Sequence, residues 1–129
     1  MRYMALAPHT DDLKVTGLDN VFCGGEKAGL LVGHTEAITT GSLAGHNAVR
    51  YLLGKDTLVL PTDLAVGDAI KYVNEVMKTE DGMKKKYTFS GSVYFNRMKE
   101  LGLYSIDVAA IKARVEKTGL ANVFATKLV

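Results

Sequence analysis

The sequence predicts a mixed α+β fold that is mostly helical. With 129 residues, 47% hydrophobic and 23% charged, the composition is that of an ordinary globular chain with a real core. Short apolar runs separated by glycine and turn residues are confined to residues 1–33. Beyond them, small or apolar residues recur at helical spacing in four segments. We therefore expect few strands, all near the amino terminus, followed by helices.

The first elements are short. Residues 11–20 are rich in turn residues and predict a loop, and Val21-Phe22-Cys23 predicts one short buried strand. A glycine-rich stretch then extends to Gly33 and predicts a second loop. A free cysteine within an apolar strand is most often a small buried hydrophobe, which is the interpretation we favour for Cys23.

Residues 35–53 predict a helix that packs closely on a neighbour. The segment has no proline, and Gly54 offers a helix stop. Each interior glycine costs about 1 kcal/mol relative to alanine, so Gly41 and Gly45 suggest that a backbone or a flat ligand approaches there. Simple tight packing on a sheet is the alternative.

The carboxyl-terminal part predicts three more helices. An extended connector at 58–61 leads to Thr62, a candidate cap for an amphipathic helix that ends near Lys78. Further helices are expected at 93–101 and, capped by Asp107, up to Gly119. The tail 120–129 could add a strand or dock as an extended arm. The change of composition near Gly54 divides the chain into units 1–54 and 55–129.

Composition limits the possible functions. Sixteen basic against fourteen acidic residues leave a formal charge of +2, too small to capture nucleic acid by charge alone. The run Lys84-Lys85-Lys86 is more typical of a solvated surface than of a phosphate contact. One cysteine excludes an internal disulfide, no His/Cys spacing suggests a metal, and no stretch approaches the roughly 20 apolar residues of a membrane helix. We expect a cytoplasmic protein.

The segment with the clearest chemistry follows the predicted strand. Gly24 and Gly25 end that strand and Glu26 comes next, as in nucleotide-binding sheets, where glycines admit the ligand and a polar side chain takes a hydroxyl. The loop then leads to a helix start near Thr35, whose free amides carry partial positive charge. His34 at this junction could hydrogen-bond a ligand, or could equally cap the helix or face solvent. His46, in mid-helix, is more typical of a structural role.

These motifs resemble a known family. The stretches 20–26, Thr35-Glu36-Ala37 and 41–50 are similar to the glucose-inhibited division protein A family of FAD-dependent proteins. They are most similar to its branch of folate- and FAD-dependent tRNA uracil-5 methyltransferases, and the close resemblance covers about residues 13–75. The resemblance implies that the fold is the carboxyl-terminal part of a two-part, Rossmann-like FAD-binding fold, followed by a helical segment.

Seven residues are candidates for binding the cofactor. The resemblance implies that Gly25 and Glu26, with Gly24 beside them, would lie along the ribityl chain and pyrophosphate of FAD. It also implies that the segment Thr35, Glu36 and Ala37 would bring a helix start to the pyrimidine edge of the flavin. The seventh candidate, His34, departs from the family, because other residues are expected at Gly33-His34. Reduced nicotinamide and a folate are implied as co-substrates of the parent enzyme, and tRNA as a partner. In the tRNA-modifying families glutamine usually stands at the position of Glu26.

One expected part of such an enzyme is not found in the sequence. A Gly-x-Gly-x-x-Gly fingerprint, which holds the adenosine end of FAD, occurs nowhere in the 129 residues. We therefore expect the amino-terminal FAD-binding portion to lie outside these residues, either in the rest of a longer protein from which this is a piece or in a separate partner chain, and the chain to be inactive without it. Apolar faces left uncovered would favour self-association. The alternatives are a helical module that docks a partner or tRNA, and a flavoprotein of the same fold acting on an unrelated small molecule.

Overall fold

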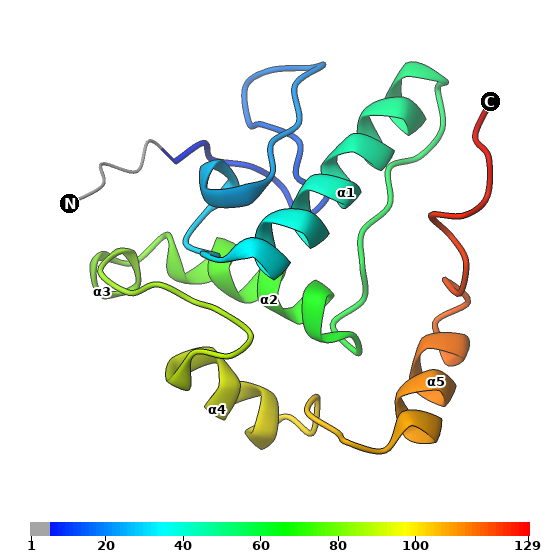
Figure 1. Cartoon of the computed structure of the whole chain (residues 1–129). Coiled ribbons are helices and arrows are strands. Elements are labelled where there is room, and N and C mark those ends of the chain that lie inside the picture. The colour runs from blue at the N-terminus through cyan, green and yellow to red at the C-terminus, as the bar shows by residue number, and fades with distance from the viewer. Residues whose placement is uncertain (1–5) are drawn as a thin grey trace.

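Five α-helices and one short 3-10 helix succeed one another along residues 6–129, the part of the chain that the computed structural model describes (Figure 1). They are η1 Gly25–Ala28, α1 His34–Leu52, α2 Ala65–Val76, α3 Glu80–Met83, α4 Ser92–Glu100 and α5 Val108–Lys117. The mostly helical prediction is confirmed. None of these helices is both long and apolar enough to cross a membrane, within the same residues.

The predicted strand at Val21–Cys23 is wrong as a regular strand. Three short arms of chain, around His9, Lys14 and Phe22, lie antiparallel and pair through isolated bridges. The amide of Val15 donates to the carbonyl of Val21 at 2.8 Å, and that of Cys23 to the carbonyl of Leu13 at 3.0 Å. Tight turns reverse the chain after each arm, so no arm is long enough to build a ladder. Burial of Cys23, 8% exposed, is confirmed.

Three helix predictions are confirmed to within a residue or two. α1 begins at His34 rather than Thr35, and α4 covers the predicted 93–101 segment. The side chain of Asp107 caps α5 by accepting from the amides of Ala109 and Ala110 at 3.0 and 3.4 Å. Local signals were sufficient here because each boundary is set by a residue inside the same turn.

Other local predictions are wrong or incomplete. Thr62 caps nothing, because a turn in which Leu64 N donates to Pro61 O at 3.1 Å delays α2 until Ala65. The glycine-rich loop contains η1, and the segment before the three lysines contains α3, whose cap Thr79 accepts from Gly82 N at 3.0 Å. The tail forms turns at 121–126 and then extends, with no strand.

The core draws on both parts of the chain. Figure 1 shows the start of α1 above the middle of α2, with the amino-terminal arms beside α1 and α4 below α2. Leu13, Cys23 and Leu43 come from before residue 54, and Ile70, Tyr87 and Tyr94 from after it, and all are buried in one cluster. A parallel bridge also pairs Leu31 with Tyr87. The division at residue 54 stays a prediction.

Asn47 joins three segments at the centre of this core. Its side chain is 0% exposed. The Nδ2 group donates to the carbonyls of Asp12 and Leu58 at 2.9 and 2.8 Å, and Oδ1 accepts from the Leu58 amide at 2.6 Å. Both polar atoms of the Asn47 side chain therefore have hydrogen-bond partners, in the Asp12 loop on one side and in the Leu58 connector on the other.

Asp12 reinforces the same junction. Its carboxylate accepts from the hydroxyls of Thr10 and Thr57 and from the amide of Lys14. Burial tends to raise the pKa of Asp12, but these hydrogen bonds outweigh it, so the pKa lies below its ordinary value. The charged form is thus the one that ties the loop to the connector.

A buried ion pair fastens α4 to α2. Asp68, 5% exposed, accepts two hydrogen bonds from Arg97, at 3.0 and 2.9 Å, and one from the hydroxyl of Tyr94 at 2.7 Å. The guanidinium stacks on the ring of Tyr72, 4.0 Å from its centroid. Hydrogen bonding to Asp68 raises the pKa of Arg97, and burial followed by the same carboxylate raises that of Tyr94. Arg97 therefore stays charged and the phenol of Tyr94 stays neutral at neutral pH.

Replacing Asn47→Ala should destabilise the fold by about 2 to 4 kcal/mol, because the Leu58 amide and two carbonyls would lose their partner inside the core. Urea denaturation followed by circular dichroism measures this. Asn96→Ala, on the exposed side of α4, is the matched control and should shift stability by less than about 0.5 kcal/mol. Equal effects of the two substitutions would contradict the role of Asn47.

Replacing Arg97→Met should cost about 3 to 5 kcal/mol, because it leaves the Asp68 carboxylate buried without its cation. The double variant Asp68→Asn with Arg97→Met should recover part of that loss, since the buried charge is gone. Chemical denaturation of both variants, with Lys85→Met as an exposed control, measures the difference. A double variant no more stable than the single one would refute the ion-pair argument.

The stability contributed by Asp12 should depend on pH. Because its pKa is lowered by folding, this contribution is fully present above the unfolded pKa, about 3.9, and is lost as pH falls through the folded pKa. Asp12→Asn should therefore be less stable than the parent chain at pH 7, with the gap closing below about pH 4. Denaturation series at pH 7 and pH 3 test this, with exposed Asp56→Asn as control. A gap that is constant with pH would contradict it.

Candidate functional site

The glycine pair after the third arm is pressed against α1. An atom at the Cβ position of Gly24 would lie 2.8 Å from both Cα and N of Gly41, closer than any side chain allows. A backbone therefore does approach α1 at Gly41, as the sequence suggested. A Cβ at Gly41 or at Gly45 would itself meet nothing within 4 Å. The steric need for glycine thus lies at Gly24, and Gly45 is simply exposed.

Gly25 is held to α1 by a hydrogen bond. Its amide donates to Thr40 Oγ1 at 2.8 Å, and the same hydroxyl donates to the carbonyl of Glu36 at 2.7 Å. Thr40 is 1% exposed. Gly25 also has a φ of +66°, a conformation that favours glycine. The turn that starts η1 is therefore fixed in place over the first turns of α1.

The beginning of α1 is open. Its N-cap is Gly33, which has no side chain to bond the first amides. His34, Thr35 and Ala37 are exposed. The amide of Ala37 donates to the Gly33 carbonyl at 2.9 Å, which leaves the amides of the first three helical residues at the positive end of a 19-residue helix. Such an end can stabilise negative charge on a ligand.

Glu36 is directed elsewhere. Its carboxylate is buried, 4% exposed, and accepts a hydrogen bond from the amide of Phe89 at 2.7 Å. A Cβ at Gly33 would overlap this carboxylate. The side chain therefore ties the start of α1 to the segment between α3 and α4. Sequence reasoning placed Glu36 in the motif but gave no signal for a partner 53 residues away.

The predicted residues come from two elements that the fold brings together. Gly24, Gly25 and Glu26 lie at the start of η1, which packs on α1, and a Cβ on Gly25 would lie 3.9 Å from that of Ala37. Glu26 is half-buried. The roles of these residues toward a cofactor stay predictions.

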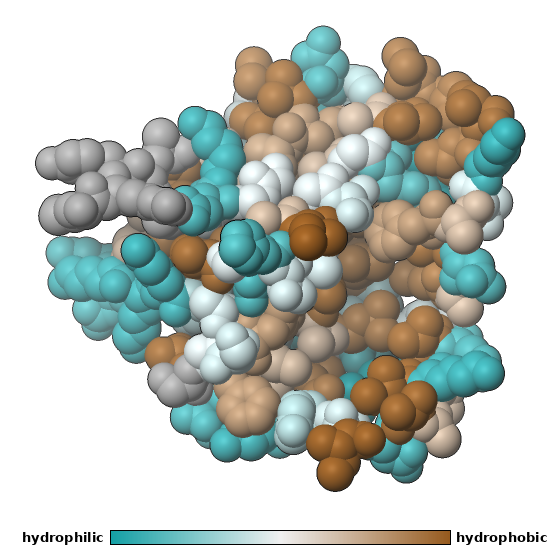
Figure 2. All heavy atoms as spheres, viewed as in Figure 1, coloured by the Kyte–Doolittle hydropathy of each residue, from teal (hydrophilic) through white to brown (hydrophobic). Residues whose placement is uncertain are grey.

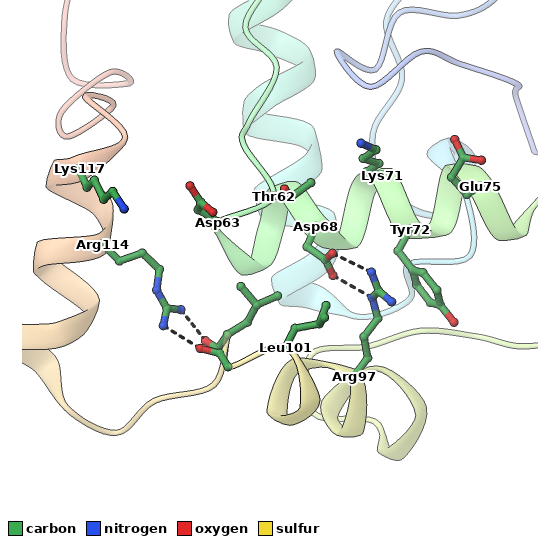
Figure 3. A pocket seen from close by; sticks show the side chains of 12 residues that line it. Thr62, Asp63, Asp68, Lys71, Tyr72, Glu75, Arg97, Leu101, Arg114 and Lys117 are labelled. Carbon is green, nitrogen blue, oxygen red and sulfur yellow. Dashed lines mark hydrogen bonds and ion pairs between the residues drawn. The ribbon is translucent and has the colours of Figure 1, made fainter.

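Two cavities lie in other parts of the molecule. One, of about 590 Å³, is bordered by α2, the turn after α4 and α5, and carries many charged side chains (Figure 3). The other, of about 770 Å³, lies between α1, the start of α2, and α5 with its tail, and is mostly apolar. Sequence reasoning missed both because each is built by segments far apart in the chain. One local signal existed for the first cavity. Asp68 is a carboxylate between Gly67 and Ala69 in α2, and all three residues are buried.

The remaining candidate residues have structural surroundings. Burial, partly offset by Lys27, raises the pKa of the Cys23 thiol, as expected for an unreactive cysteine. His46 accepts from Arg50 Nε at 2.7 Å and contacts the ring of Phe124, and burial followed by Arg50 lowers its pKa. Within the described residues, no group of three or more His, Cys, Asp or Glu side chains could hold a metal.

Comparison with known proteins points to the same part of the chain. Residues 1–56 match the family model described as glucose inhibited division protein A. The methylenetetrahydrofolate–tRNA-(uracil-5-)-methyltransferase TrmFO of Caldicellulosiruptor bescii is 35% identical over 68 residues, 53% of this chain and 15% of that protein. The enzyme of the same name from Bacillus cytotoxicus is 38% identical over 55 residues, 43% of this chain and 12% of that protein. No solved structure matches significantly.

The match thus covers about one seventh of the length of the first relative. The family model falls on residues 1–56, the segment that contains the glycine pair and α1. Through it, the chain is similar to the glucose inhibited division protein A family and to the tRNA-(uracil-5-)-methyltransferases named TrmFO.

Proposed function

We propose that this chain supplies the flavin-facing wall of an FAD-dependent enzyme that modifies uridine in tRNA. The single observation that carries the proposal is the seating of Gly24 and Gly25 on the first turns of α1, beside an uncapped helix start. This arrangement puts a backbone turn without side chains next to a set of free amides. A flat, electron-accepting ring with a polyol chain has complementary chemistry.

The described residues fit such a cofactor in most respects. Gly24 and Gly25 let a ribityl chain approach the backbone. Glu26 follows them directly in the sequence, and its carboxylate would accept hydrogen bonds from the ribityl hydroxyls. His34, Thr35 and Ala37 are exposed at the helix start. Glu36 would act only through its backbone amide, because its carboxylate is committed to Phe89. FAD, when bound, supplies the redox chemistry, and the residues named here position it.

The relatives suggest the reaction. Their name describes methyl transfer from methylenetetrahydrofolate to uracil in tRNA. We infer that the complete enzyme takes a folate as carbon donor, a reduced nicotinamide as electron source and tRNA as substrate, and that it works in the cytoplasm. The positive end of α1 would stabilise negative charge on the pyrimidine edge of the flavin.

A second polypeptide portion is part of the proposal. The 129 residues contain no Gly-x-Gly-x-x-Gly fingerprint for the adenosine end of FAD. One side of α1 is free to receive such a portion, since Ile38 is 68% exposed and Gly41, Gly45 and Ala48 are exposed along the same helix. Figure 2 shows apolar residues on several parts of the visible face. We expect the chain to self-associate through these faces when the second portion is missing.

Thr35→Glu should abolish flavin binding without harming the fold. A glutamate in the first turn stabilises a helix by about 0.3 to 1 kcal/mol, but its charge would repel the electron-rich edge and phosphates of FAD. The assay mixes the chain with FAD and the FAD-binding portion of the Caldicellulosiruptor bescii relative, expressed without its matching segment. Visible flavin absorbance after gel filtration should appear with the parent chain and be lost with Thr35→Glu.

Ala113→Glu is the matched control, because it adds the same charge at an exposed alanine of α5, away from the face of α1 that would receive the second portion. It should retain the flavin. In the same gel filtration the chain alone should elute as oligomers and the mixture as a heterodimer. A colourless mixture, or equal flavin retention by both glutamate variants, would refute the proposed site, and a monomeric chain would refute the self-association.

A further inference from the structure

The charged cavity is separate from the glycine pair and the start of α1. It is about 590 Å³ in volume and is bordered by Thr62 and Asp63 before α2, by α2 itself, by residues 101–103 after α4, and by α5. Figure 3 shows Arg114 and Lys117 extending from α5 toward the side on which Asp63 and Lys71 lie. Two elements from distant parts of the sequence therefore present cations to one space.

The cavity has uncompensated positive charge. Asp68 is neutralised by Arg97 at 2.9 Å, and Glu75 by Lys78 at 3.4 Å. Three cations then remain, Lys71, Arg114 and Lys117, and none of them has a carboxylate within ion-pair distance among residues 6–129. Asp63 is the one lining carboxylate left to oppose them. Counted over all its residues, the lining has four cations against three carboxylates, so its net charge is positive and favours an anion.

Arg114 is held in position before any ligand arrives. Its two terminal nitrogens donate to the carbonyls of Leu103 and Gly102 at 2.9 and 2.8 Å. These carbonyls neutralise no charge, so the guanidinium keeps its full charge and several free N–H groups at the cavity wall. A cation whose rotamer is already fixed loses less entropy when it binds an anion. Lys71 and Lys117 are exposed and can adjust to the ligand.

We propose that this cavity binds a phosphate ester, with Arg114 as the fixed contact and Lys71 and Lys117 closing on the anion. A guanidinium fork and two ammonium groups are the donors that protein phosphate sites use. Thr62, which also lines the cavity, offers a hydroxyl to a further phosphate oxygen. The proposal does not depend on the flavin site, since none of the seven flavin residues lines this cavity.

The test titrates inorganic phosphate into the full chain at low ionic strength and follows amide chemical shifts by NMR. We expect saturable shifts confined to residues 62–75, 101–103 and 114–117. Lys117→Met should weaken binding by about tenfold, the effect of losing one charge-assisted hydrogen bond. Lys85→Met, an exposed lysine outside the cavity, should leave the affinity unchanged. Shifts that do not saturate, or equal effects of the two variants, would overturn the proposal.

Asp63→Asn gives an independent test that improves binding instead of removing it. Loss of the opposing carboxylate should raise phosphate affinity severalfold, and Asp63 is exposed, so the fold should not change. An unchanged or weaker affinity would overturn the proposal. Titrations with adenosine monophosphate and with a short single-stranded RNA then distinguish the sources of the phosphate. Tighter binding of the monophosphate would indicate a nucleotide. Tighter binding of the RNA, lost in Lys117→Met, would indicate a nucleic-acid backbone.

Discussion

The three hydrogen bonds of Asn47 determine how the rest of this structure is arranged. A buried amide without partners would be costly, so α1 can lie only where the Asp12 loop and the Leu58 connector both reach it. The loop carries the three paired arms that lead to Gly24, and the connector leads to α2. The position of the glycine pair on α1, and of α2 beneath it, therefore follows from one side chain.

Two kinds of attachment hold the halves of the molecule. Around α1 they are hydrogen bonds between side chains and backbone groups, as at Thr40 and Asn47. Around α2 they are ionic, as at Asp68 and Arg97, and leave charged groups at the rim of a cavity. The family model covers residues 1–56 and so falls on the region around α1. The flavin proposal and the phosphate proposal thus concern different regions with different chemistry.

Sequence alone predicted α1, α4 and α5 because their limits depend on neighbours within a turn, such as Asp107 for α5. It also identified the glycine pair and the helix start through the family resemblance. It missed the bond from Phe89 to Glu36 and the cavity around Arg114, since both join residues distant in sequence. The strand at Val21–Cys23 was wrong because an apolar run indicates burial, whereas a ladder needs partners of matching length.

The bond between Glu36 and Phe89 has a consequence for how the molecule can be divided. A polypeptide cut near residue 54 would leave a carboxylate at the root of α1 without its donor and would uncover Leu31 where Tyr87 now pairs with it. We therefore do not expect the amino-terminal half to fold stably by itself. Any rearrangement that preserved the position of α1 would also have to retain the downstream segment that contains Tyr87 and Phe89.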